Sequence, residues 1–411
     1  MTPKYRFSEF VEPVSSAPLS SFITVNPDRN RALLYSKDDV LSVSGELGIV
    51  NQIELLGRSF AGESVAEYHI VESNDIVYTK SPLKANPYGI VKCNKGKTGI
   101  VSTLYAVYHC KNNTNPLFVD YYFAYDNRLN RYLKPLVRIG AKHDMKIGNE
   151  EVLVGMVCFP SFAEQQKIVD FLTVYDEKVA LQQQKVEALG RRKKGLLQKV
   201  FSQEIRFKAD DGSEFPEWER TTLDSISSRV KRKNTNNVSN LPLTISAEYG
   251  LIDQLDFFDK KIAAKDMSGY YLLQNGEFAY NKSTSKDAPV GAIKRLDRYP
   301  MGVVSTLYIC FALKADVNSD FMVHYFESSI WHNEVQLICA EGARNHGLLN
   351  IPIEGFFGIS ITLPTKNEQQ KIADFFSAID EQIEVEKKRL ESMQTIKKGL
   401  LQQMFCDGSE E

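Results

Sequence analysis

The chain has 411 residues, of which 43% are hydrophobic and 25% are charged, and its formal net charge is −2. This length allows two or more domains, and the composition is that of an ordinary globular protein. The near-neutral balance excludes a uniformly basic protein, so any contact with nucleic acid must come from local patches.

The six cysteines are scattered and form no C-x-x-C pair, which excludes a zinc ribbon and a dithiol redox motif. The opening residues, M-T-P-K-Y-R-F, have no apolar signal core. No apolar run approaches the roughly 18 residues of a membrane span. We therefore expect a cytoplasmic protein with reduced thiols.

The first part of the chain, residues 1–159, predicts a globular unit of mixed strands and helices. Runs typical of β-strands recur at 41–50, 75–78 and 100–108. Aromatic residues at helical spacing predict one amphipathic helix at 117–133, whose rings we expect to pack in the core.

A long helix is predicted at 160–203, where the sequence begins P-S-F-A-E-Q-Q-K-I-V-D-F. Ser161 and Glu164 have the spacing of a capping box. Apolar residues then recur in alternating steps of four and three, which is the pattern of a coiled-coil seam. The apolar seam positions are Ile168, Leu172, Tyr175, Val179, Val186, Leu189 and Leu196.

The second half of the chain repeats the first. A linker and second globular unit are predicted at 204–363, a second long helix at 364–406 and a short tail at 407–411. The motifs E-Q-Q-K-I and K-K-G-L-L-Q recur at a constant offset, and Thr365-x-x-Glu368 repeats the capping box. The apolar seam positions of the second helix are Ile372, Phe376, Ile379, Ile383, Leu390, Met393 and Leu400.

Neither seam can bury itself alone, so the two long helices should pack together. If a pseudo-twofold axis relates the two halves, the helices run antiparallel. Polar residues interrupt the seams at Gln182, Lys193, Glu386 and Lys397, and they could fix the register.

The globular units share a frame, while the loops between the frame positions differ. L-S-V-S-G-E-L-G-I-V-N-Q at 41–52 matches L-T-I-S-A-E-Y-G-L-I-D-Q at 243–254, and V-S-T-L-Y occurs at 101–105 and 304–308. Divergent loops on a shared frame suit two modules that do the same work on different targets.

No catalytic constellation is present. Asn86-Pro87-Tyr88 is similar to the N-P-P-Y motif of adenine methylases but lacks its second proline, and no F-x-G-x-G loop occurs. Gly96-Lys97-Thr98 lacks the earlier glycine of a phosphate-binding loop. The six histidines show no metal-ligand spacing, so we expect neither a catalytic residue nor a metal site.

DNA binding would need cations and hydroxyls for phosphates and polar side chains for base edges. Such side chains cluster in loops of both units, and a basic run occurs at 231–234. Solvated surface charge is the alternative interpretation of each lysine. The DNA-binding candidates are Tyr78, Lys80, Ser81, Lys84, Lys142 and His143 in the first unit, and Tyr280, Lys282, Ser283, Thr284, Lys286, Arg344, Asn345 and His346 in the second.

The doubled P-x-x-x-E-Q-Q-K-I-x-D-F motif, each copy leading a helix that ends K-K-G-L-L-Q, resembles the specificity subunit of type I restriction-modification systems. F-P-E-W-E, which opens the second unit, also fits, whereas the first unit lacks the tryptophan that Trp218 supplies. The resemblance implies an α+β fold: two pseudo-symmetric mixed α/β target recognition domains, separated by two long α-helices packed as an antiparallel coiled coil.

In this family each globular domain reads one half of a bipartite double-stranded DNA site. The helices act as a spacer and dock two methyltransferase subunits, and restriction subunits join the full complex. The resemblance implies that S-adenosylmethionine, ATP and Mg²⁺ belong to those partners, so that this chain holds no cofactor and is not an enzyme. Two alternatives are a coiled-coil adaptor without a DNA role, and a methyltransferase or nuclease with unrecognised motifs.

Overall fold

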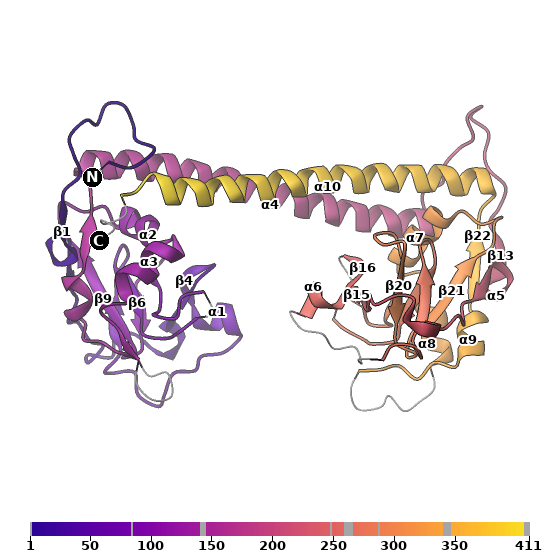
Figure 1. Ribbon diagram of the computed structural model, residues 1–411, viewed down its shortest axis with the longest axis horizontal. Coiled ribbons are helices and arrows are strands. Elements are labelled where there is room, and N and C mark those ends of the chain that lie inside the picture. Colours follow the sequence, from indigo (N-terminus) through magenta and orange to yellow (C-terminus); the bar gives the residue numbers. More distant parts are fainter. Residues whose placement is uncertain are drawn as a thin grey trace. The chain divides into compact units, whose positions relative to one another are not determined.

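The computed structural model describes residues 2–83, 85–139, 145–246, 249–258, 266–286, 288–339 and 347–406 (Figure 1). The chain divides into two compact units. Unit 1 comprises Met1–Gln183 and Lys388–Glu411, and unit 2 comprises Gln184–Lys387. Each long helix is therefore shared between the units, whereas the sequence analysis treated the helices as separate segments.

The long helices are α4, Phe162–Phe201, and α10, Lys366–Gln403. In unit 1, Leu172 near the start of α4 shares a core cluster with Leu401 near the end of α10. Further along α4, the Tyr175 hydroxyl donates to the Met393 carbonyl at 3.2 Å. Residues later in α4 thus contact residues earlier in α10. The halves of the two helices that belong to unit 1 are therefore antiparallel.

Unit 2 pairs the remaining halves in the same sense. Lys185 Nζ lies 2.5 Å from Glu386 Oε1, whereas Val200, near the end of α4, shares a cluster with Phe376, near the start of α10. All the apolar seam residues named above are buried or half-buried in the structure.

Unit 1 is built on a four-stranded antiparallel sheet in the order β2-β9-β6-β7, accompanied by the two-stranded pairs β1–β12, β3–β4, β5–β8 and β10–β11. The strands are β1 Ser16–Pro18, β2 Ile23–Val25, β3 Leu41–Ser44, β4 Gly48–Asn51, β5 His69–Val71, β6 Ile76–Thr79, β7 Val91–Cys93, β8 Gly99–Val101, β9 Tyr105–Cys110, β10 Arg138–Ile139, β11 Met145–Lys146 and β12 Met156–Cys158. The helices are α1 Gln52–Leu56, α2 Pro116–Phe123 and α3 Asp126–Leu133, with the 3₁₀ turns η1 Leu19–Ser21, η2 Lys37–Asp39 and η4 Glu151–Val154.

Unit 2 repeats this plan with the sheet β14-β21-β18-β19 and the pairs β13–β22, β15–β16 and β17–β20. Its strands are β13 Glu219–Thr222, β14 Ser227–Arg229, β15 Leu243–Ser246, β16 Gly250–Asp253, β17 Tyr271–Gln274, β18 Phe278–Asn281, β19 Ala292–Arg295, β20 Met301–Val304, β21 Ile309–Leu313 and β22 Ser360–Leu363. Its helices are α5 Leu223–Ile226, α6 Gln254–Phe258, α7 Ser319–Glu327, α8 His332–Ile338 and α9 Ile353–Phe357, with the 3₁₀ turn η5 Thr235–Asn237.

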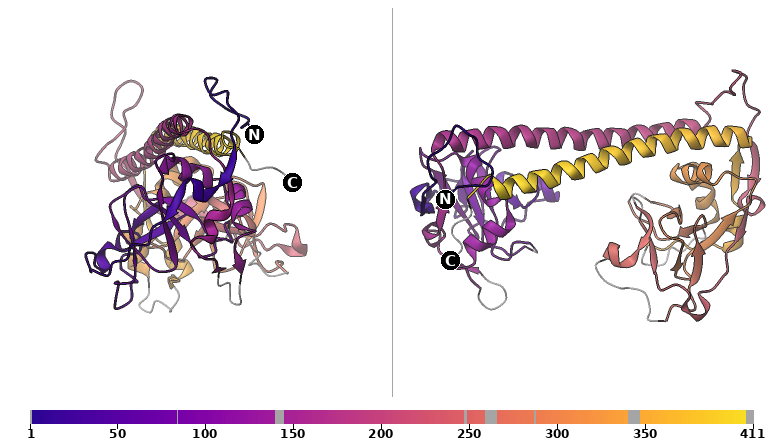
Figure 2. Two further views of the ribbon diagram at one scale, coloured as in Figure 1. Left: turned by 90° about the vertical axis from the view of Figure 1, so that its left-hand side faces the viewer. Right: turned by 45° about the horizontal axis from the view of Figure 1, so that its top comes forward.

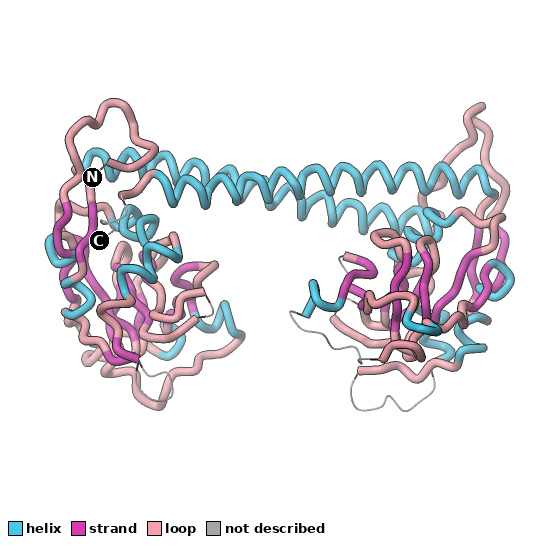
Figure 3. Tube along the Cα trace, in the orientation of Figure 1, coloured by secondary structure: helices cyan, strands magenta, loops and turns pink. Residues whose placement is uncertain are grey.

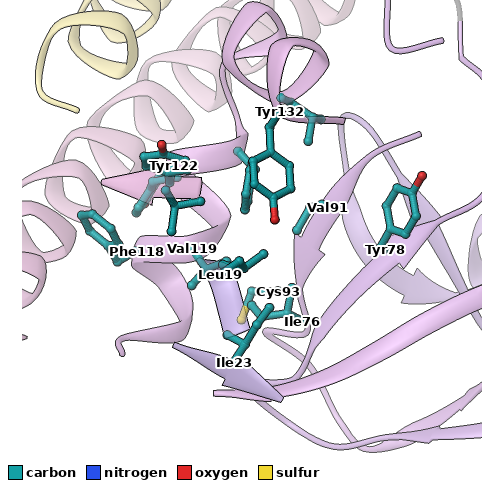
Figure 4. Packing of buried hydrophobic residues seen from close by; sticks show 14 of the residues in the cluster. Leu19, Ile23, Ile76, Tyr78, Val91, Cys93, Phe118, Val119, Tyr122 and Tyr132 are labelled. Atoms are coloured by element: carbon teal, nitrogen blue, oxygen red, sulfur yellow. The ribbon is translucent and has the colours of Figure 1, made fainter. Parts of the chain in front are cut away.

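The core of each unit joins its sheet to the long helices. In unit 1, Ile76 of the sheet, Phe118 and Tyr122 of α2, and Phe405 after α10 belong to one buried cluster, part of which Figure 4 shows. Helix α2 supplies the contact between the two layers, and α7 has the same place in unit 2 (Figure 3). Burying such side chains contributes roughly 1.5–3 kcal/mol each, so the helix halves are part of each unit's core.

The predicted single helix at 117–133 is wrong in one respect. It is divided into α2 and α3, because Tyr125 adopts extended backbone angles, φ −90° and ψ 109°. The break lets Asp126, in the first turn of α3, accept a hydrogen bond from Asn86 Nδ2 at 2.9 Å. Aromatic spacing alone could not reveal it, since both helices bury rings in the same core.

Among the described residues, no helix has the length and apolar character needed to cross a membrane. All six cysteines are free thiols.

Candidate nucleic-acid interface

One loop is built in the same way in both units: the β6–β7 loop, residues 80–89, and the β18–β19 loop, residues 282–291. Tyr78 and Tyr280 lie just before these loops, and both were predicted to contact DNA. That prediction is wrong for both tyrosines, because their side chains are 0% exposed. Each hydroxyl donates instead to a carbonyl near the loop's end, that of Tyr88 or Val290, at 2.7 Å.

A glycine closes each loop against its tyrosine. Gly89 has φ +91° and Gly291 has φ +81°, a region that L side chains rarely adopt. A Cβ at Gly89 would lie 2.0 Å from the Thr79 carbonyl oxygen, and one at Gly291 would lie 2.2 Å from that of Asn281. Tyrosine and glycine therefore fix both ends of each loop, while five of the nine residues at 80–88 and 282–290 differ between the units.

In unit 1 the loop contacts the segment that follows β11. Lys80 Nζ donates to Asn149 Oδ1 at 2.8 Å, and the Asn149 carbonyl accepts from the Tyr108 hydroxyl at 3.0 Å. Burial lowers the pKa of Lys80, although Glu151 opposes the shift. Ser81 is exposed. The candidates Lys84, Lys142 and His143 lie outside the described residues.

In unit 2 the loop pairs with the backbone at 347–349. The Thr284 backbone N–H and its hydroxyl both donate to the Gly347 carbonyl, at 2.7 Å and 3.0 Å. The Leu349 N–H donates to the Lys282 carbonyl at 3.0 Å, which leaves the Lys282 side chain half-buried. Ser283 and Lys286 are exposed. The candidates Arg344, Asn345 and His346 lie outside the described residues.

Each loop is thus tied to a segment that follows other predicted DNA-binding residues: Lys142 and His143 in unit 1, and Arg344, Asn345 and His346 in unit 2. This proximity joins parts of the chain that are far apart in sequence. Whether these residues contact DNA stays a prediction.

The repeated E-Q-Q motif fastens each globular fold to a long helix. Gln165 Oε1 accepts from the Asn115 backbone N–H at 2.9 Å, and Gln166 Oε1 accepts from Asn115 Nδ2 at 2.8 Å. Asn115 is also the N-cap of α2, because its Oδ1 accepts from Leu117 N. One asparagine therefore positions α2 and docks it on α4.

The same clamp occurs in unit 2. Gln369 Oε1 accepts from the Asn318 backbone N–H at 2.9 Å, and Gln370 Oε1 accepts from Asn318 Nδ2 at 2.7 Å. Asn318 caps α7 through Phe321 N. Sequence analysis found the glutamines but missed both asparagines, although each follows the last strand of its sheet and begins a helix.

The motif's glutamate has a different role from the one predicted. Ser161 Oγ accepts from Glu164 N at 3.4 Å, as a capping box requires. The Glu164 carboxylate, however, binds Arg6 through two hydrogen bonds of 2.7 Å, and Glu368 binds Arg206 at 2.9 Å. A buried carboxylate is better stabilised by a bidentate guanidinium than by one backbone donor.

Arg6 and Arg206 reveal an equivalence that spans the ends of the chain. Arg206 lies in the segment after α4, which ends at Phe201. Arg6 lies near the N-terminus, beside the end of α10 (Figure 2), where the Tyr5 N–H donates to the Gln403 carbonyl at 3.0 Å. The N-terminal segment of unit 1 thus takes the place that the segment after α4 takes in unit 2. The repeated Arg-Phe dipeptide, at 6–7 and 206–207, was the available signal.

Three of the polar seam residues, Lys193, Glu386 and Lys397, make ion pairs between the helices, and the pair of Glu386 with Lys185 is described above. Lys397 Nζ lies 2.6 Å from Asp176 Oδ1 in unit 1. In unit 2, Lys193 Nζ lies 2.6 Å from both Asp380 Oδ1 and Glu327 Oε2. These pairs hold one register, because a shift along either helix would separate them.

His324 lies in the same network, which corrects the expectation that no histidine clusters with other metal-ligand types. One ring nitrogen of His324 and one carboxylate oxygen from each of Glu327 and Asp380 lie within 4.8 Å of one another. The Lys193 ammonium contacts both carboxylates, so the lysine already supplies the cation. We assign the cluster as an ion-pair network and not as a metal centre.

The long helices also carry exposed apolar residues outside their seams. Phe171, Val174 and Leu181 on α4 are all more than a third exposed, as are Val385 and Ile396 on α10. Leu181 and Val385 occupy equivalent positions of the two helices. Exposed apolar residues on a helix outside its own seam are typical of a surface that meets another protein.

Comparison with known proteins agrees with this architecture. The family model described as the type I restriction modification DNA specificity domain matches residues 230–395. The type I restriction enzyme MjaVIII specificity subunit of Methanocaldococcus jannaschii is 22% identical over 349 residues, which cover 81% of this chain and 78% of the relative.

Two solved structures share the fold. One, from work on complex assembly and conformational transition of the type I R-M system, has a TM-score of 0.55 at 14% identity and covers 96% of this chain and 98% of its own. The other, the type I restriction-modification S subunit of M. genitalium, has a TM-score of 0.50 at 13% identity and covers 100% of both chains. The chain therefore shares its overall fold with these two structures. In sequence, the chain is thus similar to type I restriction-modification specificity subunits, both in the family model and in the curated relative.

Proposed function

We propose that this chain is the DNA-reading and assembly subunit of a type I restriction-modification complex. Each unit reads one half of a bipartite double-stranded site, and the long helices set the spacer between the halves. The observation that carries the proposal is the pair of loops at 80–89 and 282–291. They have equal length and identical tyrosine and glycine anchors. Of the nine residues at 80–88 and 282–290, four are identical and five differ, which suits two readers of different sequences on one frame.

The long helices suit a spacer. Helix α4 has 40 residues and α10 has 38, which corresponds to about 60 Å at roughly 1.5 Å per residue. The ion pairs of Lys193 and Lys397 hold their register. Paired half-sites at a set separation are the usual arrangement for proteins with two DNA-reading units.

The exposed apolar positions on α4 and α10 support docking of methyltransferase subunits. Leu181 and Val385 are equivalent positions, so the proposal places one methyltransferase subunit on each and two in the complex, to which restriction subunits are added. Transfer of the methyl group from S-adenosylmethionine, and ATP- and Mg²⁺-dependent cleavage, are assigned to these partners. The chain itself is proposed to be non-catalytic and without a cofactor.

Modified-base sequencing tests the proposal. DNA is taken from cells that express this chain with its cognate methyltransferase subunit, and from cells that express the methyltransferase subunit alone. We expect a split motif with a methylated adenine in each half only when this chain is present. A stable complex that leaves DNA unmodified would favour the adaptor alternative, and turnover of S-adenosylmethionine by the purified chain alone would establish the enzyme alternative.

A domain exchange tests the modular part. Residues 1–159 are replaced by the corresponding segment of another family member, and the motif is sequenced again. We expect one half of the motif to change and the other to stay. A change in both halves, or in neither, would contradict one half-site per unit.

A further inference from the structure

Both units contain a second anchored loop, which sequence analysis did not identify. We call it the asparagine-anchored loop, with its tip at Arg31–Leu34 in unit 1 and at Thr235–Val238 in unit 2. The anchors, Asn30 and Asn234, precede the tips and are 1% and 0% exposed. Each tip is four residues long.

The two asparagines make the same set of hydrogen bonds. Asn30 Nδ2 donates to the carbonyls of Tyr35, at 2.8 Å, and Val65, at 3.3 Å, and Asn30 Oδ1 accepts from Tyr35 N at 3.1 Å. Asn234 Nδ2 donates to the carbonyls of Ser239, at 2.9 Å, and Met267, at 3.3 Å, and its Oδ1 accepts from Ser239 N at 2.9 Å. One buried side chain thus fastens both ends of each tip.

The backbone inside the tips matches in part, although Asn236 has φ +60° and its counterpart Ala32 has no positive φ. The Leu33 N–H donates to the Asn30 carbonyl at 2.8 Å, and the Asn237 N–H donates to the Asn234 carbonyl at 2.9 Å. Leu33 and Asn237 both have φ +51°. Asparagine tolerates this left-handed region, whereas leucine there costs roughly 1–2 kcal/mol. The anchors hold Leu33 in a conformation that its own side chain disfavours.

A basic residue immediately precedes the asparagine anchor of each loop. Arg29 Nη1 donates to the Glu67 carbonyl at 2.6 Å, and Lys233 Nζ donates to the Gly269 carbonyl at 2.8 Å. Burial lowers the pKa of His69, and the charges of Arg29 and Lys80 lower it further. Arg29 also forms an antiparallel β-bridge with His69, so the asparagine-anchored loop of unit 1 begins beside this histidine.

The tips differ in chemistry on this common frame. In unit 1 the side chains of Leu33 and Leu34 are 62% and 75% exposed, beside the exposed Arg31. In unit 2 the corresponding tip presents the exposed Asn236, whereas the Asn237 amide oxygen accepts from the Met267 N–H at 3.3 Å. Val238, equivalent to Leu34, is 63% exposed, so the two tips differ mainly at the positions of Ala32 and Leu33. Apolar side chains contact thymine methyl groups or enter base steps, and asparagine amides pair with adenine edges.

We propose that the asparagine-anchored loops are base-reading elements: unit 1 contacts bases through the apolar side chains of Leu33 and Leu34, and unit 2 does so through the amide of Asn236. Arg31 binds the adjacent phosphate. Its pairing with Glu67, at 3.3 Å between exposed groups, is weak enough to exchange. This proposal rests on the proposed function, since it names residues that read the DNA.

The test exchanges one tip for the other in the full-length chain, assembled with its methyltransferase subunit. The variant R31T/A32N/L33N/L34V gives unit 1 the unit 2 tip and keeps its length and both anchors. Asparagine relieves the strain at position 33, so folding is not at risk. The control is Val11→Ser, which replaces another exposed apolar residue of unit 1, 82% exposed.

We expect the exchange to weaken binding of the original site by about 10- to 100-fold, the effect of losing one or two base contacts. The unit 1 half of the methylated motif should change, while the unit 2 half and the control variant stay as in the unaltered chain. Replacing the thymines of the unit 1 half-site one at a time by uracil, which lacks the methyl group, should lower affinity for the unaltered chain but not for the variant.

An unchanged motif with unchanged affinity would overturn the proposal. Loss of the methyltransferase or restriction subunits, with the motif retained in whatever complex forms, would overturn it too and make the tip a protein contact. The unaltered complex separates these results from failure of the proposed function. If the unaltered complex does not modify DNA at a split motif, the proposed function itself is wrong, and the loops then have no base-reading role.

Discussion

The ammonium group of Lys193 on α4 lies 2.6 Å from the carboxylate of Asp380 on α10. Lys397 and Asp176 make the equivalent contact in unit 1, also at 2.6 Å. A lysine in an apolar seam costs stability, but here it finds a carboxylate on the facing helix only in the native register. The pairs therefore select one alignment of the two helices.

Replacing Lys193 by methionine should destabilise unit 2 by about 1–3 kcal/mol. The substitution leaves the carboxylates of Glu327 and Asp380 close together without their shared cation. Chemical denaturation followed by fluorescence measures the loss. Lys194→Met is the matched control, because Lys194 is exposed on the same helix and should be neutral. Equal stability of the two variants would show that the pair does not hold the helices.

Gly89→Ala should destabilise unit 1 more strongly than Gly57→Ala. Both glycines have positive φ, +91° and +74°, so both variants carry the backbone cost of about 1 kcal/mol. Only a Cβ at Gly89 meets another atom, at 2.0 Å, whereas nothing lies within 4 Å at Gly57. We expect Gly89→Ala to cost about 2–4 kcal/mol in total, measured by denaturation. Similar costs would mean that the loop adjusts without strain.

The buried histidine of unit 1 should make stability depend on pH. Burial, with the charges of Arg29 and Lys80, lowers the pKa of His69 from 6.5 to about 4. The unfolded chain therefore binds a proton at a higher pH than the folded chain does. The stability that neutral His69 allows is fully present above pH 6.5 and is lost as the pH falls from 6.5 to about 4.

His69→Gln removes this titration. The difference in unfolding free energy between the unaltered chain and the variant should be constant above pH 6.5 and should shift in the variant's favour between pH 6.5 and 4. Glu327→Gln is the comparison. Burial raises the pKa of Glu327, but His324, Lys193 and Lys294 outweigh it and lower the pKa to about 2, so its window runs from pH 4.5 to 2. A pH-independent difference for His69→Gln would contradict the assignment.

Adding one heptad to both long helices should lengthen the spacer of the methylated motif. The insertions are placed after Gln183 in α4 and after Lys387 in α10, where the units divide, so pairing is kept on both sides. Seven residues add about 10 Å of helix, or roughly three base pairs. Modified-base sequencing should show unchanged half-sites with a longer gap. A modified motif with the original gap would show that the helices do not set the spacing.

Much of the architecture can be predicted from the sequence, because it depends on the spacing of residues along the chain. A heptad pattern and a constant repeat offset are local properties, so the long helices and the duplicated units follow from them. The bounds of α4 and α10 lie within three residues of those predicted. The loops with equal anchors are likewise visible as a repeat, although the repeat could not say what each anchor does.

The roles of individual side chains were decided by the tertiary structure. Tyr78 and Tyr280 were chosen because they repeat, yet a repeated residue can belong to the frame as easily as to the reading surface. Only burial against the sheet distinguishes the two. Glu164 was assigned to its own helix end, but folding brings Arg6 within 2.7 Å, and a charged bidentate partner is stronger than a backbone donor.

The roles of Asn30 and Asn234 were likewise decided by the tertiary structure. Nothing about a single asparagine in a polar loop indicates an anchor, because its partners at Val65 and Met267 are distant in sequence. By itself the sequence determined the repeat, the seams and the two-unit plan, because periodicity is a property of the spacing of residues along the chain. The structure alone decided which repeated residues are buried and which reach solvent, because burial depends on contacts between segments that only folding brings together.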